Sequence, residues 1–149
     1  MKFPKRKHPR LKEYDYSNDG GYFVTVCVKN KEKLLGEPVL VNGKIKLTPI
    51  GETAEKHIKA INSAYDGVRV DSYMIMPDHI HMLITIGGGM RACRPTSLQT
   101  VVRTFKTMVT REIGFSVWQT SFYEHIVRDE KDYTDIDNYI KANPQKYAR

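Results

Sequence analysis

The sequence predicts an α+β fold with an antiparallel, ferredoxin-like sheet. Strand-like and helix-like segments follow each other as strand, hairpin, helix, strand, strand, helix, strand and helix, an order that suits this architecture. The two central strands, residues 68–76 and 79–86, are separated by Pro77-Asp78 alone. Such a joint is long enough for a hairpin, whereas a parallel pair needs a crossover of about a dozen residues or more. A doubly wound parallel sheet is therefore the less favoured alternative.

Each element before the central strands has its own local signal. Residues 22–28 are rich in β-branched and aromatic side chains, which is typical of a strand, and a turn signal precedes them at residues 18–21. Residues 38–47 predict a hairpin with its turn at Asn42-Gly43. A helix should follow, with Thr48 as its N-cap and Pro49 at its first position; apolar side chains recur along it at Ile50, Ala54, Ile58, Ile61 and Tyr65.

The elements after the central strands are a helix, an edge strand and a last helix. Ser97 is expected to cap the first of these helices, and Gly114 is expected to end it. Residues 122–127 predict the edge strand. The last helix should begin at residue 129 or 130 and end near Asn143, because a residue that precedes proline avoids the helical region.

The basic charge of the chain is concentrated at its N-terminus. Of the 24 Lys and Arg, six lie within residues 1–12, where there is no acidic residue, while the remaining 18 nearly balance the 17 acidic residues. We therefore divide the chain into a basic arm, residues 1–18, and one domain, residues 19–149. A basic arm is the usual sign of a polyanionic partner such as nucleic acid, although a solvated tail would have the same composition.

Composition also excludes several classes of protein. No apolar run approaches the roughly 20 residues of a membrane span, and no apolar stretch follows the basic arm, so neither a membrane protein nor a signal peptide is expected. Two cysteines, Cys27 and Cys93, are too few for a disulfide scaffold or a four-thiolate zinc site. We therefore expect a cytoplasmic protein.

His79 and His81 are the first candidates for a site. They start the second central strand, where side chains two residues apart share a face and their Cα atoms are about 6.6 Å apart. Both imidazoles could then reach one ion. Packing does not need the histidines, because the opposite face carries the unbroken apolar row Ile80, Met82, Ile84 and Ile86. Taken alone, the pattern also fits two half-exposed histidines at a strand end.

Comparison with known classes of histidine-containing sites limits the chemistry that His79 and His81 could serve. Histidine-triad nucleotide hydrolases need a third histidine where this chain has Leu83, and the two-histidine phosphoesterases need a paired His-x-Thr or His-x-Ser, which the sequence lacks. A structural zinc site would want four ligands, and the remaining histidines and cysteines lack ligand spacing. Two imidazoles with an oxygen donor and open positions suit Mg²⁺ or Mn²⁺ at a phosphate.

Tyr139 and Asn143 form the second candidate pair. They are four residues apart on the last predicted helix, so they lie one above the other on one face. The Asn carbonyl oxygen could supply the missing metal ligand, and the Tyr hydroxyl could act as a nucleophile. An ordinary core stripe of Ile136, Tyr139, Ile140 and Asn143 has the same spacing, so the pattern alone leaves both interpretations open.

A second, weaker candidate surface lies on the helix that Ser97 caps. Arg103 and Lys106 lie on this helix, and no acidic residue occurs between residues 91 and 111. Its outer face therefore either contacts phosphates or is simply solvated. Trp118, Phe122 and Tyr123 similarly fit either the core or a stack of nucleobases, with the core favoured.

Several strings carry a resemblance when they are taken together and in order. They are Pro9-Arg10-Leu11-Lys12, Tyr14-Asp15-Tyr16, residues 22–27, Tyr73-Met74-Ile75-Met76-Pro77-Asp78-His79-Ile80-His81, residues 118–119 and 121–129, and Tyr139-Ile140-Lys141-Ala142-Asn143-Pro144. With them the chain resembles the single-tyrosine HUH transposases, and among these the REP-associated tyrosine transposases related to the smallest bacterial insertion sequences. The resemblance extends from about residue 9 to residue 147, and its specific part is Met-Pro-x-His-x-His followed by Tyr-Ile-x-x-Asn-Pro.

The resemblance implies an HUH endonuclease fold, single-stranded DNA with hairpins as the substrate, and Mg²⁺ or Mn²⁺ as the cofactor. It implies that His79, His81 and Asn143 bind the metal and that Tyr139 is the nucleophile. Asp78 departs from the family, in which Asn is more usual, and it adds a negative charge beside the metal. The given sequence also stops six residues after Asn143, so we expect no longer C-terminal tail that helps to hold DNA.

The sequence therefore predicts a metal-dependent single-stranded DNA endonuclease and strand transferase that acts at hairpin-forming repeats through a 5′-phosphotyrosine intermediate. The alternative is a hairpin-binding protein of the same fold with little or no cleavage; a metal-dependent nucleotide phosphodiesterase is a third class. The recognised repeat, the general base and the choice between monomer and homodimer stay open. Candidate DNA contacts are Lys5, Arg6, Lys7, Arg10, Lys12, Arg103 and Lys106.

Overall fold

The computed structural model describes residues 20–65, 67–87 and 97–147, with side chains up to residue 142. The predicted arm, residues 1–18, lies outside this described part. The strands and helices follow each other in the predicted order, with a short 3₁₀ turn at Lys29–Lys31. They are β1 Gly20–Cys27, β2 Gly36–Val41, β3 Lys44–Leu47, α1 Pro49–Ala64, β4 Val68–Ile75, β5 His79–Ile86, α2 Leu98–Ile113, β6 Tyr123–Ile126 and α3 Glu130–Tyr147.

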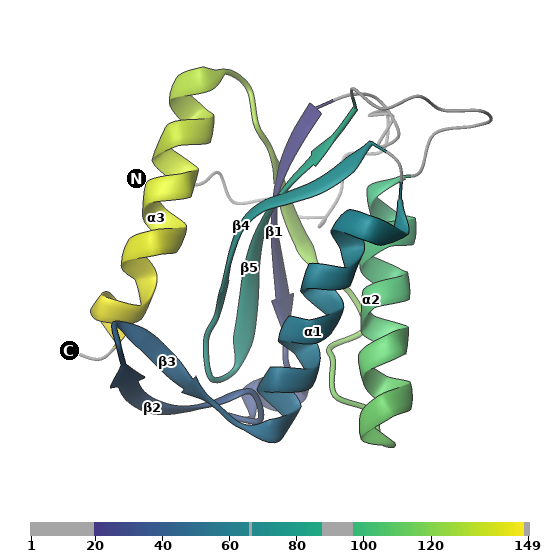
Figure 1. Ribbon diagram of the computed structural model, residues 1–149, viewed down its shortest axis with the longest axis vertical. Helices are drawn as coiled ribbons and strands as arrows, with labels where there is room; N and C mark the ends of the chain where they lie inside the picture. Colours follow the sequence, from purple (N-terminus) through teal and green to yellow (C-terminus); the bar gives the residue numbers. More distant parts are fainter. Residues whose placement is uncertain (1–19, 66, 88–96, 148–149) are drawn as a thin grey trace.

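The sheet has the predicted ferredoxin-like, antiparallel topology. Its strands are ordered β4-β5-β1-β6, and every neighbouring pair is antiparallel. β2 and β3 form a separate hairpin, in which Asn42 and Gly43 both have positive φ angles, as a two-residue type I′ turn requires. Helices α1 and α2 cover one face of the sheet, and α3 lies on the other side (Figure 1).

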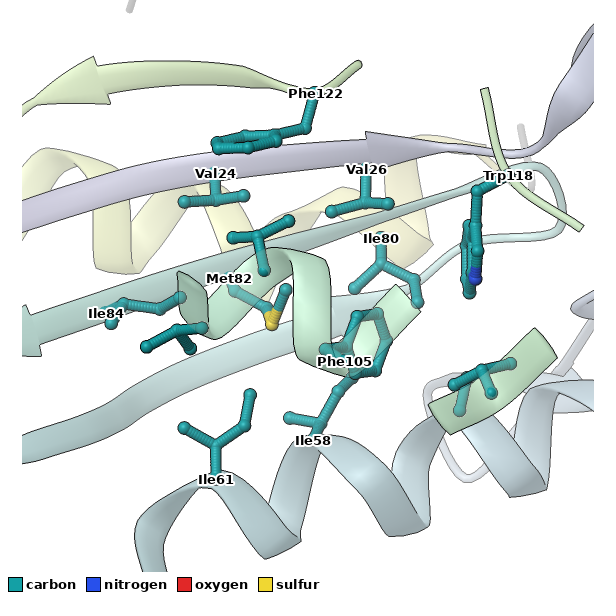
Figure 2. Close-up of a cluster of buried hydrophobic side chains, with 14 of the residues drawn as sticks. Val24, Val26, Ile58, Ile61, Ile80, Met82, Ile84, Phe105, Trp118 and Phe122 are labelled. Carbon is teal, nitrogen blue, oxygen red and sulfur yellow. The ribbon is translucent and has the colours of Figure 1, made fainter. Parts of the chain in front are cut away.

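The face beneath α1 and α2 contains the main hydrophobic core. The apolar row of β5 packs there against Ile58 and Ile61 of α1 and Phe105 of α2 (Figure 2). Trp118 and Phe122 belong to this core, and the ring of Trp118 lies 5.6 Å from that of Phe105 between centroids. These two aromatic residues are therefore core residues, as the sequence favoured. The same expectation is wrong for Tyr123, whose side chain is exposed.

The helix ends follow the predicted capping chemistry. Thr48 accepts a hydrogen bond from the amide of Gly51 at the start of α1, and Ser97 accepts one from the amide of Thr100 at the start of α2. Gly114 ends α2 in the left-handed conformation, with φ of 95°. Of the described helices, none is both long and apolar enough to span a membrane.

The predicted end of the last helix is wrong. We expected α3 to end near Asn143, but it continues to Tyr147 and passes through Pro144. The proline lacks an N–H group, so the helix forgoes one hydrogen bond to the carbonyl of Ile140. The conformational preference of a residue before proline is a bias, and a helix can continue past a proline when it accepts this loss.

Candidate active site

Strand β5 presents His79 and His81 to the face of the sheet that α3 covers. Their neighbours on the same face are Leu83, which is buried beneath α3, and Thr85. The two imidazole rings lie 4.7 Å apart between centroids. His79 is partly exposed, whereas only 6% of His81 is exposed. The expectation that both imidazoles share one face is thus confirmed, and the pair consists of an outer and an inner histidine.

Each imidazole has a polar partner at its Nδ1 atom. Nδ1 of His79 lies 2.7 Å from Oδ1 of Asp78, and Nδ1 of His81 lies 3.0 Å from Oγ1 of Thr25 on the neighbouring strand β1. Partners at Nδ1 hold an imidazole in one orientation and leave Nε2 to face another group, as is usual for histidines that bind metals. Asp78, the residue that departs from the family pattern, therefore orients the imidazole of His79.

Burial keeps His81 neutral. Removal from water, together with the neighbouring charge of His79, lowers the pKa of His81 to about 3. At neutral pH the ring thus has a lone pair available without first losing a proton. A neutral imidazole is the form that binds metal ions, so the environment of His81 matches that of a ligand.

Helix α3 brings Tyr139 to the histidines. The ring of Tyr139 lies 5.7 Å from that of His81 between centroids, in an edge-to-face arrangement. The ring of Phe23 on β1 is close to both, with its centroid 5.1 Å from that of His81 and 6.0 Å from that of Tyr139. The helix is held in this place because Ile136 and Ile140, on either side of Tyr139 in the chain, are buried against Phe23 and Leu83.

Asn143, the third expected metal ligand, is only partly described. Its backbone belongs to α3, one turn beyond Tyr139, but its side chain lies outside the described residues. Among the described residues there is no cluster of three or more His, Cys, Asp or Glu side chains that could hold a metal ion. Any third protein ligand must therefore come from a residue of another type or from outside this part of the chain.

Of the seven candidate DNA contacts, two lie in the described part of the chain, and these two are away from this site. Lys5, Arg6, Lys7, Arg10 and Lys12 belong to the arm, outside the described residues. Arg103 and Lys106 are on α2, on the opposite face of the sheet from Tyr139, where they line a cavity of about 310 Å³. The Lys106 ammonium donates hydrogen bonds to the carbonyls of Gln119 and Thr120, so it holds the loop before β6. Arg103 is exposed.

Strand β1 contributes residues that the sequence interpretation missed. Thr25 pairs with His81, and Cys27 pairs with His79, across the β1–β5 ladder. Both lie on the face of the histidines, as does Phe23. The alternation of Phe23, Thr25 and Cys27 with the buried residues Val24 and Val26 was visible in the sequence. What the sequence could not give was the register that puts Thr25 opposite His81.

The comparisons with known proteins agree with this architecture. A family model described as "Transposase IS200 like" matches residues 16–143. An uncharacterized protein of Haemophilus influenzae is 37% identical, over 93% of this chain and 88% of its own length. A REP-associated tyrosine transposase of Escherichia coli is 29% identical, over 53% of this chain and 46% of its own.

Two solved structures have the same fold. A REP-associated tyrosine transposase bound to a REP hairpin matches with a TM-score of 0.68 and 24% identity, over 92% of this chain and 74% of that one. A putative transposase from Deinococcus radiodurans matches with a TM-score of 0.52 and 16% identity, over 89% and 95%. Since the family model spans most of the sequence, the chain belongs to the IS200-like transposase family.

Proposed function

We propose that this transposase is a metal-dependent single-stranded DNA endonuclease and strand transferase with Tyr139 as its nucleophile. The observation that supports this most is that α3 brings one tyrosine ring next to two oriented histidines on a distant strand. A hydroxyl nucleophile beside paired imidazoles is an arrangement suited to metal-assisted attack on a phosphodiester. The ferredoxin-like scaffold alone would not specify this chemistry.

The side chains present fit a divalent cation. His79 and His81 have Nδ1 partners that leave Nε2 available, and burial keeps His81 neutral. We assign both as metal ligands, with Asn143 as the third. Two imidazoles and one amide oxygen leave positions open for phosphate oxygens, which suits Mg²⁺ or Mn²⁺. Such an ion, when bound, stabilises charge on the non-bridging oxygens of the scissile phosphate.

The reaction we propose is a transesterification. The Tyr139 oxygen forms a bond to the phosphorus, and the bond from phosphorus to the 3′ oxygen breaks, with its electron pair staying on that oxygen. The phenol proton is lost and the 3′ oxygen gains one, so charge is balanced. The products are a 5′-phosphotyrosine and a free 3′-hydroxyl. Because the phosphodiester is conserved in the covalent bond, attack by another 3′-hydroxyl transfers the strand without a nucleotide cofactor.

We propose single-stranded DNA that carries a hairpin as the substrate. The support is the similarity to a REP-associated tyrosine transposase that was solved with a REP hairpin bound. The six basic residues of the arm would contact phosphates without reading sequence, so their contribution to affinity should fall steeply as salt rises. On α2, exposed Arg103 is the better candidate for a phosphate contact, because the ammonium of Lys106 already holds three backbone carbonyls.

A denaturing gel with end-labelled hairpin DNA tests the proposal. We expect wild-type protein with Mn²⁺ to give a labelled species that survives denaturation and disappears on protease treatment. Chelation of the metal and the substitution Tyr139→Phe should each abolish it while hairpin binding persists. Binding without any adduct, with Mg²⁺ or Mn²⁺ and across several hairpins, would instead favour a hairpin-binding protein. Hydrolysis of mononucleotide esters would favour a phosphodiesterase.

A further inference from the structure

Strand β4 contains a bulge next to a carboxylate that lies toward α3. Its pairing with β5 shifts between Val70, which faces Ile84, and Ser72, which faces Leu83. Before the bulge, Val68 and Val70 pack on the α1/α2 core, and after it the residues that do so are Tyr73 and Ile75. The alternation is therefore broken between Asp71 and Ser72. Asp71 follows Val70 on the opposite face, so its carboxylate lies on the α3 face with Arg69, and the bulge adds Ser72 to that same face.

On this face the Asp71 carboxylate accepts hydrogen bonds from three donors. Its Oδ2 atom accepts hydrogen bonds from the Thr85 hydroxyl at 2.6 Å and from the Tyr133 hydroxyl at 2.8 Å. Its Oδ1 atom accepts one from the guanidinium of Arg69. Burial by itself raises the pKa of Asp71, but the hydrogen bonds from Arg69, Thr85 and Tyr133 outweigh this and bring the pKa below its ordinary value.

The bonded residues belong to the elements that carry the candidate active site. Thr85 lies on β5, on the same face as His79 and His81, and Tyr133 lies on α3, six residues before Tyr139. Six residues of helix rise about 9 Å, so the hydroxyl of Tyr133 is anchored less than two turns from the candidate nucleophile. Asp71 thus joins the helix that carries the tyrosine to the strand that carries the histidines.

The apolar contact beneath α3 is small, which makes a polar anchor important. In the described part of the chain, this cluster has four buried members, Phe23, Leu83, Ile136 and Ile140. Figure 1 shows α3 standing apart from α1 and α2. Besides β4, β5 and the β2–β3 hairpin, it contacts Phe23 of β1, and Oδ2 of Asp132 on α3 lies 2.9 Å from Nε2 of His125 on β6. A small shift of α3 along the sheet would therefore disturb few buried apolar contacts. A directional hydrogen bond opposes such a shift.

We propose that Asp71 is a positioning residue, which holds Tyr133 and Thr85 together and so sets where Tyr139 lies relative to His79 and His81. This inference rests on the proposed function for its effect on rate, and on geometry alone for its effect on α3. Misplacement of a reacting group by about 1 Å can cost up to about 100-fold in rate, so loss of the anchor should be visible in chemistry before it is visible in folding.

The first test compares two tyrosines that make the same kind of bond on opposite faces of the sheet. Tyr133→Phe removes the hydroxyl bound to Asp71, and Tyr73→Phe removes a hydroxyl that donates to Glu55 of α1 at 2.9 Å. Both hydroxyls are partly buried and donate to a carboxylate, and burial and that carboxylate raise the pKa of each phenol to about 12. Only the first bond connects to α3.

We expect Tyr133→Phe to lower the rate of adduct formation at saturating hairpin DNA by about 10-fold or more, with DNA affinity and Mn²⁺ dependence unchanged. Tyr73→Phe should leave the rate within about two-fold of wild type, which is the scatter of such comparisons. Asp71→Ala should resemble Tyr133→Phe, and Asp71→Asn, which keeps an acceptor oxygen, should recover part of the rate. Equal rates for wild type and Tyr133→Phe, or equal losses in both tyrosine variants, would overturn the inference.

Amide hydrogen exchange gives a readout that does not need cleavage. Tyr133→Phe should speed exchange along α3 and leave β5 and α1 as in wild type, whereas Tyr73→Phe should leave α3 unchanged. If α3 exchanges at the same rate in Tyr133→Phe and wild type, the positioning inference fails whether or not DNA is cleaved. If wild type forms no adduct while α3 responds as expected, the proposed function fails and the anchor stands.

Discussion

The two faces of the central sheet differ sharply in chemistry although they share the same strands. On the face beneath α1 and α2, β5 contributes Ile80, Met82, Ile84 and Ile86 to one continuous apolar core. On the face beneath α3, the same strand contributes two histidines, a leucine and a threonine. β1 repeats the division, with Val24 and Val26 on one side and Thr25 and Cys27 on the other.

This difference separates stability from chemistry. Apolar burial supplies most of the driving force for folding, and it is concentrated on the α1/α2 face. The α3 face buries a neutral imidazole and a hydrogen-bonded carboxylate, both of which cost solvation that the rest of the molecule must offset. A sheet with one largely apolar face, on which Glu124 is a buried exception, can therefore support polar groups on its other face. The predictions below test this separation.

The largest effect is expected at His79, on the α3 face. His79→Ala should lower metal-dependent adduct formation by roughly 1,000-fold, because a metal contributes several kcal/mol of charge stabilisation. The melting temperature without metal should change little, since a quarter of this side chain is exposed. Gel assays measure adduct formation, and thermal denaturation measures the melting temperature. Normal cleavage by this variant would place the metal site elsewhere.

The opposite result is expected at Ile84, on the same strand but the other face. Ile84 is fully buried, so Ile84→Ala should lower the free energy of unfolding by about 2–5 kcal/mol. The cleavage rate per folded molecule should stay as in wild type. Urea unfolding measures this free energy. The control is Val41→Ala on the exposed β2–β3 hairpin, whose free energy of unfolding should stay within about 0.5 kcal/mol of wild type. A loss below about 1 kcal/mol at Ile84 would contradict the division between faces.

A smaller effect is expected at Thr25, which contacts His81 from β1. Thr25→Val keeps the shape of the side chain and removes the hydroxyl 3.0 Å from Nδ1 of His81. Loss of such a partner usually weakens metal binding by about 10–100-fold, so cleavage should need more Mn²⁺ and recover at high concentrations. A Mn²⁺ titration of adduct formation measures this shift. An unchanged midpoint would mean that Thr25 does not orient the ring.

The smallest effect concerns pH and Asp71. Its folded pKa lies below the ordinary value, so it contributes stability that is fully present above the unfolded pKa of about 3.9 and is lost as pH falls through the folded pKa. The difference in unfolding free energy between wild type and Asp71→Asn should be constant from pH 8 to about 5 and shrink below about 4. Urea unfolding of both proteins along a pH series measures this difference. A difference that persists into strong acid would rule out the ionised carboxylate as its source.

Local chemistry made most of the fold predictable. The caps at Thr48 and Ser97, the turn at Asn42-Gly43 and the alternation along β5 each depend on a few neighbouring residues, and the structure confirms them. The end of α3 was not predictable in the same way, because the preference of a residue before Pro144 can be overridden by the rest of the helix.

The candidate site was predictable only in part. The shared face of His79 and His81 follows from the two-residue period of a strand, and the structure places Tyr139 beside them. Thr25 and Asp71 could not be found from the sequence. The first depends on the register between β1 and β5, and the second on the β4–β5 pairing and the docking of α3, which bring Asp71 to Thr85 and Tyr133. Both are long-range features of the fold.

The most direct test of the central claim is to map where DNA attaches to the protein. Wild-type protein is incubated with a hairpin oligonucleotide and Mn²⁺, the trapped adduct is digested, and the peptide that carries DNA is identified by mass spectrometry. We expect the DNA on the peptide that contains Tyr139, and none after Tyr139→Phe. DNA on Tyr133, Tyr123 or Tyr147 would contradict the assignment of the nucleophile, even though the chain would remain a member of its family.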